Sequence, residues 1–425
     1  MLRDRYNRTG QAETTRTLAL SQRPGVKPPA FPLGWVLAMV IAASPVAAVA
    51  ADDDPPEEVV ESGRVIVTEV GATIQIADKK PRPVETGTVL TYSRRNGPWL
   101  WIDSLWGWVE ESSVKPLAEA ETYYTRLIEE AREKKGDGSK DGKGGQDAEP
   151  QQVPVELHQR GIVRLSLGRP AEALEDFDAS LEEGYKAANV HANRGRALLA
   201  LDRFDDAMDA MTEAIAANPE AGGSYDARAL ALMEKEFFEA ALTDADKAIE
   251  LAPGHAMYWY NRGQIQRSLG QYEPAVKSFN EAIRLAPRFV EALTNRGFSL
   301  KRLGRIEQAA EDYRQAIEID PQLSVAYNDL AWLLATTGDE SLRSGEDAVE
   351  LAERAVELLD ADEAGDDATR GQYADTLAAA YAAAGQWEKA VEAGRRAVEL
   401  LDGADQYAAD QRLELYLKKE PYIGK

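Results

Sequence analysis

The sequence predicts a mainly α-helical protein in which paired helices stack into a solenoid behind a small all-β barrel. Small residues return every 34 residues between positions 153 and 402, a spacing typical of helical repeats. Short β-branched runs fill residues 63–117 and predict strands. The chain is also strongly acidic, with 49 Lys and Arg against 73 Asp and Glu and a formal charge of −24.

The composition excludes several classes of function. The chain has 425 residues, enough for two or three domains of roughly 150 residues each. It contains no cysteine, which excludes disulfides, thiolate metal sites and cysteine nucleophiles, and it has only three histidines. An acidic chain is a poor binder of nucleic acid, because phosphate binding needs clustered Lys and Arg. We therefore expect a helix-rich binding protein with no nucleic-acid partner.

The first 50 residues have the pattern of a signal peptide. A basic leader precedes an uncharged segment from Phe31 to Ala50, and Ala48 and Ala50 stand just before an acidic stretch. This pattern predicts cleavage after Ala50, with residues 51–62 as an acidic linker. The mature chain would then be exported to the periplasm or cell envelope.

The alternative is an uncleaved membrane anchor over residues 31–50. Pro32 and Pro45 shorten its apolar centre below the ~20 residues that a membrane span needs. Both interpretations place the rest of the chain outside the cytoplasmic membrane. Contact with the membrane is expected only if residues 31–50 stay uncleaved.

Residues 63–117 are expected to form a barrel of five short strands. Gly71 separates the first two β-branched runs, and Asn96-Gly97 is a strong hairpin signal. The stretch resembles the bacterial Src-homology-3-type domain in its pattern Gly97-x-Trp99-Leu100-Trp101-Ile102, then Gly107-Trp108-Val109, then Val114. Eukaryotic members of that family bind proline-rich peptides in a groove lined by aromatic residues and a proline. Glu110–Ser113 stand where the groove Pro and Tyr are expected, so this activity is not carried over.

The barrel segment is rich in tryptophan. The period of a strand places Trp99 and Trp101 on one face and Leu100 and Ile102 on the other, so one of these pairs packs the core. The other pair is at least partly exposed. The tryptophan face either completes the packing of the barrel or forms an aromatic platform for a peptide or a cell-wall ligand.

A helix over residues 118–135 and a flexible linker over 136–152 are expected to follow. The helix has apolar residues at helical spacing, whereas the linker is rich in Gly, Lys, Asp and Gln with no apolar period. The start of this linker looks like a calcium loop, but Ala148 occupies the position of the required Glu. We expect no metal site there.

Residues 153–402 carry several series of small residues in one 34-residue phase. The first is Gly161, Gly195, Ala229, Gly263, Gly297 and Ala331. The second, twelve residues on, is Ala173, Ala207, Ala241, Ala275 and Ala309. Small residues let two helices approach closely, and each pair must stack on the next to bury its apolar face. The period and these positions resemble the tetratricopeptide repeat, with five regular and two diverged copies, and residues 403–425 are predicted to form a capping helix, centred on Gln411–Tyr416, and a tail.

The resemblance implies a binding surface on the first helix of each pair, which lines the concave groove of the family's solenoids. The family's groove positions fall on Asn193, Arg196, Asp226, Met257, Tyr260, Asn261, Gln264, Arg267, Asn295, Phe298, Lys301 and Arg302. Four of them form a basic stripe that suits a carboxylate or an extended acidic peptide: Arg196, Arg267, Lys301 and Arg302. No repeat has the Lys and Asn pair of the family's carboxylate clamp, so clamp-type chaperone binding is not expected. The alternative is a merely solvated face.

A second basic series lies one residue before the small one, at Arg160, Arg194, Arg228, Arg262 and Arg296. We expect each stem to pack between helices while the guanidinium pairs with a carboxylate of the same repeat's second helix, such as Asp176, Asp244 or Asp312. The alternative is that these arginines bind a ligand.

No hydrolytic or phosphate-binding motif occurs, so the sequence predicts neither an enzyme nor a cofactor. The expected function is an exported scaffold that binds a protein or peptide in the solenoid groove, with the barrel as a second binding module. The alternative is a cell-wall-associated accessory or hydrolase-related protein that uses the barrel to bind the wall.

Overall fold

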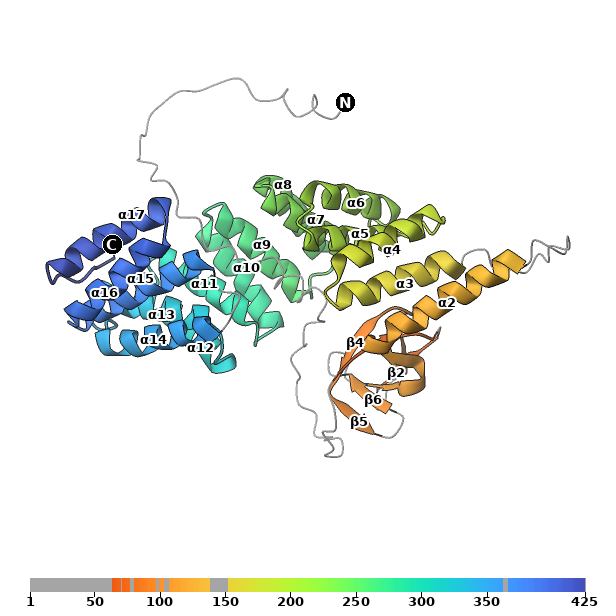
Figure 1. Ribbon diagram of the computed structural model, residues 1–425, viewed down its shortest axis with the longest axis horizontal. Helices are drawn as coiled ribbons and strands as arrows, with labels where there is room; N and C mark the ends of the chain where they lie inside the picture. Colours follow the sequence, from red (N-terminus) through yellow and green to blue (C-terminus); the bar gives the residue numbers. More distant parts are fainter. Residues whose placement is uncertain are drawn as a thin grey trace, which may run out of the picture.

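The computed structural model describes residues 63–69, 71–76, 80–96, 99–102, 107–137, 152–361 and 366–424. The predicted signal segment, the acidic linker 51–62 and most of the predicted linker 136–152 lie outside these residues. Within them the expected fold class is confirmed, because sixteen α-helices follow a small β region (Figure 1). None of these helices is long and apolar enough to cross a membrane.

The β region contains eight short strands among the described residues, where five were expected. They are β1 (Gly63–Val67), β2 (Thr73–Gln75), β3 (Arg82–Pro83), β4 (Val89–Tyr92), β5 (Arg94–Asn96), β6 (Trp99–Ile102), β7 (Gly107–Glu110) and β8 (Val114–Pro116). They form two antiparallel sheets, β4-β1-β8 and β3-β2-β7-β6-β5. Asn96 pairs with Trp99 across β5 and β6, where the sequence predicts a hairpin. The two sheets enclose one apolar core that includes Val65, Ile74 and Val109.

The solenoid consists of consecutive antiparallel helix pairs. The regular part runs through α3 (Gln152–Ser166), α4 (Pro170–Glu182), α5 (Ala188–Ala200), α6 (Phe204–Ala217), α7 (Gly222–Glu234), α8 (Phe238–Leu251), α9 (Ala256–Ser268), α10 (Tyr272–Leu285), α11 (Val290–Arg302) and α12 (Ile306–Ile319). The diverged part is α13 (Ser324–Thr336), α14 (Gly345–Ala361), α15 (Asp367–Ala383) and α16 (Trp387–Leu400).

Close helix packing explains the series of small residues. A Cβ added to Gly263 would lie 2.6 Å from Cε1 of Phe279, and one added to Gly161 would lie 2.5 Å from Cε1 of Phe177. Both aromatic rings are fully buried, as are the alanines of the second series. The glycine of a first helix therefore makes room for a large residue on its second helix, as at Gly161, Gly195, Gly263 and Gly297.

The C-terminal helix is longer than the sequence suggests. We expected it to centre on Gln411–Tyr416, whereas α17 spans Gly403–Leu417. Ala409, Leu413 and Tyr416 are buried on one face of it at helical spacing. The first half of α17 has few large apolar residues, so its period is weak in the sequence and becomes visible only against the buried face of α16.

Helix α2 (Leu117–Asp137) joins the β region to the first helix pair (Figure 1). Ile66 of β1, Tyr124 of α2 and Val163 of α3 are buried in one shared cluster. Arg64 of β1 also donates directly to the backbone carbonyl oxygen of Ser166 in α3, at 2.9 Å. The β region is therefore docked on the solenoid and does not hang from it by a tether.

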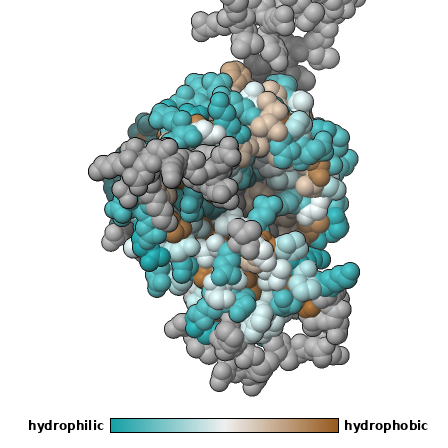
Figure 2. Space-filling view, turned by 90° about the vertical axis from the view of Figure 1, so that its right-hand side faces the viewer, coloured by the Kyte–Doolittle hydropathy of each residue, from teal (hydrophilic) through white to brown (hydrophobic). Residues whose placement is uncertain are grey.

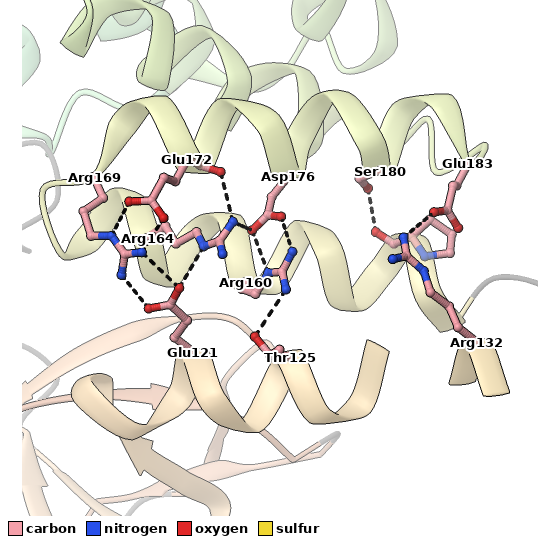
Figure 3. Close-up of polar contacts among 11 residues, drawn as sticks. Glu121, Thr125, Arg132, Arg160, Arg164, Arg169, Glu172, Asp176, Ser180 and Glu183 are labelled. Carbon is pink, nitrogen blue, oxygen red and sulfur yellow. Dashed lines mark hydrogen bonds and ion pairs between the residues drawn. The ribbon is translucent and has the colours of Figure 1, made fainter. Parts of the chain in front are cut away.

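Polar contacts reinforce this docking (Figure 3). Glu121 of α2 accepts hydrogen bonds from Arg164 and Arg169. Burial acts to raise the pKa of its carboxyl group, but the two arginines together outweigh burial and the pKa is lowered. Arg132, near the other end of α2, pairs with Glu183 at 3.0 Å. Helix α2 thus packs on α3 in the way that the second helix of a preceding repeat would.

Candidate peptide-binding face

The arginines that precede the small residues are engaged inside the solenoid. Arg160, Arg228 and Arg296 each donate two hydrogen bonds to one aspartate of the second helix in their own repeat, respectively Asp176, Asp244 and Asp312. The expected pairing is confirmed for these three repeats. Their guanidinium groups therefore join the two helices of each of these pairs.

The intervening arginines pair differently from what we expected. Arg194 contacts Asp178 and Arg262 contacts Asp246, at 2.6 and 2.7 Å, and both aspartates belong to the preceding repeat. The reason is that α6 and α10 have Ala210 and Ser278 where the other second helices have aspartate. Helices α4 and α8 supply two aspartates each, one for their own repeat and one for the next.

A second series of hydrogen bonds links successive first helices. Asn193 contacts Nε2 of His158 at 3.0 Å, Asn261 donates to Asp226 at 2.9 Å, and Asn295 donates to the hydroxyl of Tyr260 at 3.4 Å. Each pair is 35 residues apart, so the same two positions meet at each of these repeat interfaces.

This series decides the role of several predicted groove residues. Tyr260, Asn261 and Asn295 are almost fully buried, and Gln264 is only 9% exposed. The amide groups of Asn261 and Asn295 donate within the protein, so these two side chains position the first helices. Met257 is likewise buried in the core between α9 and α10. Asp226 is buried too, and burial raises its pKa to about 6 although Asn261 donates to it.

Four of the predicted groove residues do gather on the surface of α9 and α11. The Cζ of Arg267 and the Nζ of Lys301 each lie 5.4 Å from the ring centre of Phe298. The ring of Tyr272 lies 6.4 Å from that ring, and the Cζ of Arg302 lies 5.2 Å from the ring of Tyr272. We call these five residues the Phe298 cluster; Tyr272 was not predicted because it begins a second helix.

The three cations of the Phe298 cluster make no ion pair with any carboxylate of the described residues. The Nε of Arg267 is buried there without a hydrogen-bond partner, and burial lowers the pKa of its guanidinium. The carboxyl group of Asp329 on α13 interacts electrostatically with this cluster: burial raises its pKa, and the charges of Lys301 and Arg267 oppose that rise. The cluster therefore presents more positive than negative charge in an acidic chain.

Arg196 lies apart from the Phe298 cluster, on α5. Its Nη1 donates to Oδ1 of Asn193 at 2.8 Å. A Cβ added to Gly223 would lie 3.3 Å from its Nη2 and 3.4 Å from the hydroxyl of Tyr258. The predicted basic stripe is thus divided into one arginine at α5 and three cations at α9 and α11.

The structure shows which of the two side-chain pairs of β6 packs the core of the β region. Leu100 and Ile102 are buried, whereas Trp99 and Trp101 on the opposite face of β6 are half-buried. Trp101 packs edge-on against Trp108 of the neighbouring strand, with ring centres 5.2 Å apart. Figure 2 shows a mainly hydrophilic surface at this end of the molecule, with hydrophobic residues scattered over it.

Comparison with known proteins identifies the repeats. Residues 158–222 and 227–288 match one tetratricopeptide repeat family, and residues 290–323 match a second family of the same repeat. No curated protein matches the chain.

Several solved structures are similar to part of the chain. A tetratricopeptide repeat protein from Parabacteroides merdae has 17% identity, covering 62% of this chain and 98% of its own, with a TM-score of 0.43. A thermophilic repeat protein from Thermus thermophilus has 23% identity, covering 43% and 98%, with a TM-score of 0.37. YrrB, described as having an unusual peptide-binding site, has 20% identity, covering 44% and 93%, with a TM-score of 0.36.

Proposed function

We propose that this chain of tetratricopeptide repeats is a non-enzymatic interaction scaffold that binds an extended acidic peptide segment of a partner protein at the Phe298 cluster. The observation that carries the proposal is a set of three cations with no ion-pair partner in the described residues: Arg267 and Lys301 lie over the ring of Phe298, and Arg302 lies over the adjacent ring of Tyr272. In a chain with a formal charge of −24, such uncompensated positive charge on one face favours an anionic ligand.

The chemistry of the cluster favours a particular kind of segment. Arginine binds carboxylates through two parallel hydrogen bonds, and lysine adds a positive charge without that geometry. The rings of Phe298 and Tyr272 offer apolar contact between the cations. A segment that carries Asp or Glu on both sides of an aromatic or aliphatic residue would satisfy both features.

The N-terminal pattern supports export, so we further propose that the scaffold acts in the periplasm or cell envelope. The docked β region would be its second binding module, with the half-buried Trp99 and Trp101 on the binding surface. Trp101 packs on Trp108, so the two rings together form an aromatic surface on this face.

A binding measurement tests the peptide site. A fluorescein-labelled peptide of Glu and Asp with one central Phe is titrated with the full-length chain, and binding is followed by fluorescence polarisation. Replacing Arg267 and Lys301 by Gln should weaken binding about tenfold at low ionic strength, because two charges are lost from the site. The effect should shrink as added salt screens the remaining charges.

The matched control removes the same charge elsewhere in the same repeats. Lys277 and Arg288 are exposed and lie outside the Phe298 cluster, so their replacement by Gln should leave binding nearly unchanged. Equal loss of binding in both double variants would show a general charge effect and contradict the proposed site.

A further inference from the structure

The chain turns back on itself after its last helix. Lys419 has a φ of 60°, a left-handed conformation that reverses the chain direction at the end of α17. Residues 420–424 form neither helix nor strand, and the backbone N–H of Gly424 donates to the carbonyl oxygen of Thr336 in α13 at 2.8 Å. The tail, residues 420–424, therefore lies against the end of a first helix.

An aromatic contact also holds the tail. The ring of Tyr422 lies 6.0 Å from that of Trp332 on α13. The Cζ of Arg412 lies 5.3 Å from the ring of Trp332 and 5.6 Å from the ring of Tyr422. Asp375 accepts two hydrogen bonds from Arg412, at 3.0 and 2.6 Å, so this guanidinium is fixed and its charge is already compensated.

The position of Trp332 connects the tail to the rest of the first-helix face. Trp332 follows Phe298 by one repeat of 34 residues, and Thr336 stands in the same relation to Arg302. The tail thus contacts, in the sixth repeat, the two positions that Phe298 and Arg302 hold in the fifth. The tail makes two kinds of contact with this face: the ring of Tyr422 packs on Trp332, and a backbone hydrogen bond joins Gly424 to the end of α13.

We propose that the surface around Trp332 is a second peptide site, selective for a segment with an aromatic side chain, and that the tail of the same chain occupies it. The site selects an aromatic ring and not a carboxylate, because the charge of Arg412 is taken by Asp375. This proposal uses a different helix, a different ligand chemistry and different contacts from the Phe298 cluster, and it does not depend on that cluster.

The exposure of the tail indicates that it can dissociate from the solenoid. Glu420, Pro421 and Ile423 are exposed, and Tyr422 is the one large tail side chain that is half-buried against the solenoid. A segment that contributes little buried area is released at little cost in free energy. A partner segment with a similar ring would therefore compete with the tail for Trp332.

The test compares the full-length chain with a chain that ends at Lys419. The probe is a fluorescein-labelled synthetic peptide with the sequence of residues 418–425, and its binding is measured by fluorescence polarisation. The shortened chain should bind about tenfold or more tightly than the full-length chain, because its site is vacant. The full-length variant Tyr422→Ala should bind the probe like the shortened chain, since its tail lacks the ring.

Two further variants test whether Trp332 is the residue that binds the probe peptide. Trp332→Ala in the shortened chain should abolish binding, whereas Trp387→Ala, which removes another partly buried tryptophan from the same core cluster, should preserve it. Circular dichroism checks that every variant is folded. The same affinity for the shortened and full-length chains, or binding that survives loss of Trp332 in a folded variant, would overturn the proposal.

Discussion

Arg262 forms its ion pair with Asp246 of the preceding repeat, although Arg228, at the same position one repeat earlier, pairs with Asp244 of its own repeat. The two aspartates are separated by one residue on α8, so a single second helix serves two arginines. One bond closes a helix pair and the other joins that pair to the next. The solenoid therefore has a structural period of two repeats.

The two bonds should contribute unequally to stability. The side chain of Asp244 is 10% exposed and that of Asp246 is 55% exposed. Replacing Asp244 by Ala leaves Arg228 without its buried partner and should cost about 3 kcal/mol. Replacing Asp246 by Ala should cost less than about 1 kcal/mol, because water screens that pair. Urea unfolding of the two variants measures the difference, and equal midpoints would contradict this assignment.

The close approach of Gly263 to Phe279 predicts that a larger residue at position 263 destabilises the protein. Gly263→Ala places a Cβ against the buried ring of Phe279 and should destabilise the protein by about 1–3 kcal/mol. Adding Phe279→Leu should recover part of this loss, because the smaller side chain makes room. Ala229 is the natural control: it holds the same position and is tolerated because Ala245 stands where Phe279 does. Thermal unfolding checks both variants, and no recovery in the double variant would disprove the explanation.

Two turns of the solenoid have a strained backbone. Asp202 and Glu236 have φ values of 56° and 62° at the position that Gly168, Gly270 and Gly304 hold in other repeats. Left-handed conformation costs a non-glycine residue roughly 1–2 kcal/mol, part of which glycine regains. Asp202→Gly and Glu236→Gly should therefore stabilise the protein by up to about 1 kcal/mol each. Calorimetry should show raised melting temperatures, whereas a lowered one for both variants would argue against strain.

The buried His158 predicts a dependence of stability on pH. Burial lowers its pKa to about 4, from an ordinary value of 6.5, so the folded protein keeps the imidazole neutral. The unfolded chain binds a proton there below pH 6.5 and the folded chain does not. The free energy of unfolding should therefore fall as the pH drops from about 6.5 to 4, by on the order of 2 kcal/mol from this group.

His158→Gln isolates that effect. The amide can still bond to Asn193 but does not titrate, so the variant should lose less stability over the same pH range. Urea unfolding at pH 7 and pH 5 measures both proteins. A wild-type and a variant protein with the same change in midpoint would show that His158 is not the responsible group.

The divided basic stripe predicts that its members differ in their effect on peptide binding. Lys301→Glu should weaken binding of an acidic peptide strongly, because it reverses a charge within the Phe298 cluster. Arg196→Glu should act weakly, because Arg196 lies on α5 and is held by Asn193. Polarisation titrations of the two single variants measure the difference. A larger effect of Arg196→Glu would move the site toward α5.

Several parts of the structure follow from local sequence patterns. The 34-residue period predicts the helix pairs, because small and large residues recur at fixed positions on the facing sides of the two helices. The pairing of Arg160 with Asp176 is predictable for the same reason, because both belong to one repeat. The three cations of the Phe298 cluster are also found by counting positions along the first helices.

Other parts were not predictable from the sequence. The burial of Asn261 and Asn295 depends on how closely successive first helices stack, and their partners lie in neighbouring repeats. The docking of β1 on α3 and the return of Tyr422 to Trp332 join segments far apart in the chain. No local pattern marks either contact.

By itself, the sequence determined the repeat, its phase and the residue types that each helix presents, because these depend on contacts within one helix pair. Only the tertiary structure decided which aspartate each arginine binds, which polar side chains are buried and which part of the first-helix face the tail covers. The physical reason is that these outcomes depend on the distance and angle between stacked pairs, which fix the partners within hydrogen-bonding reach.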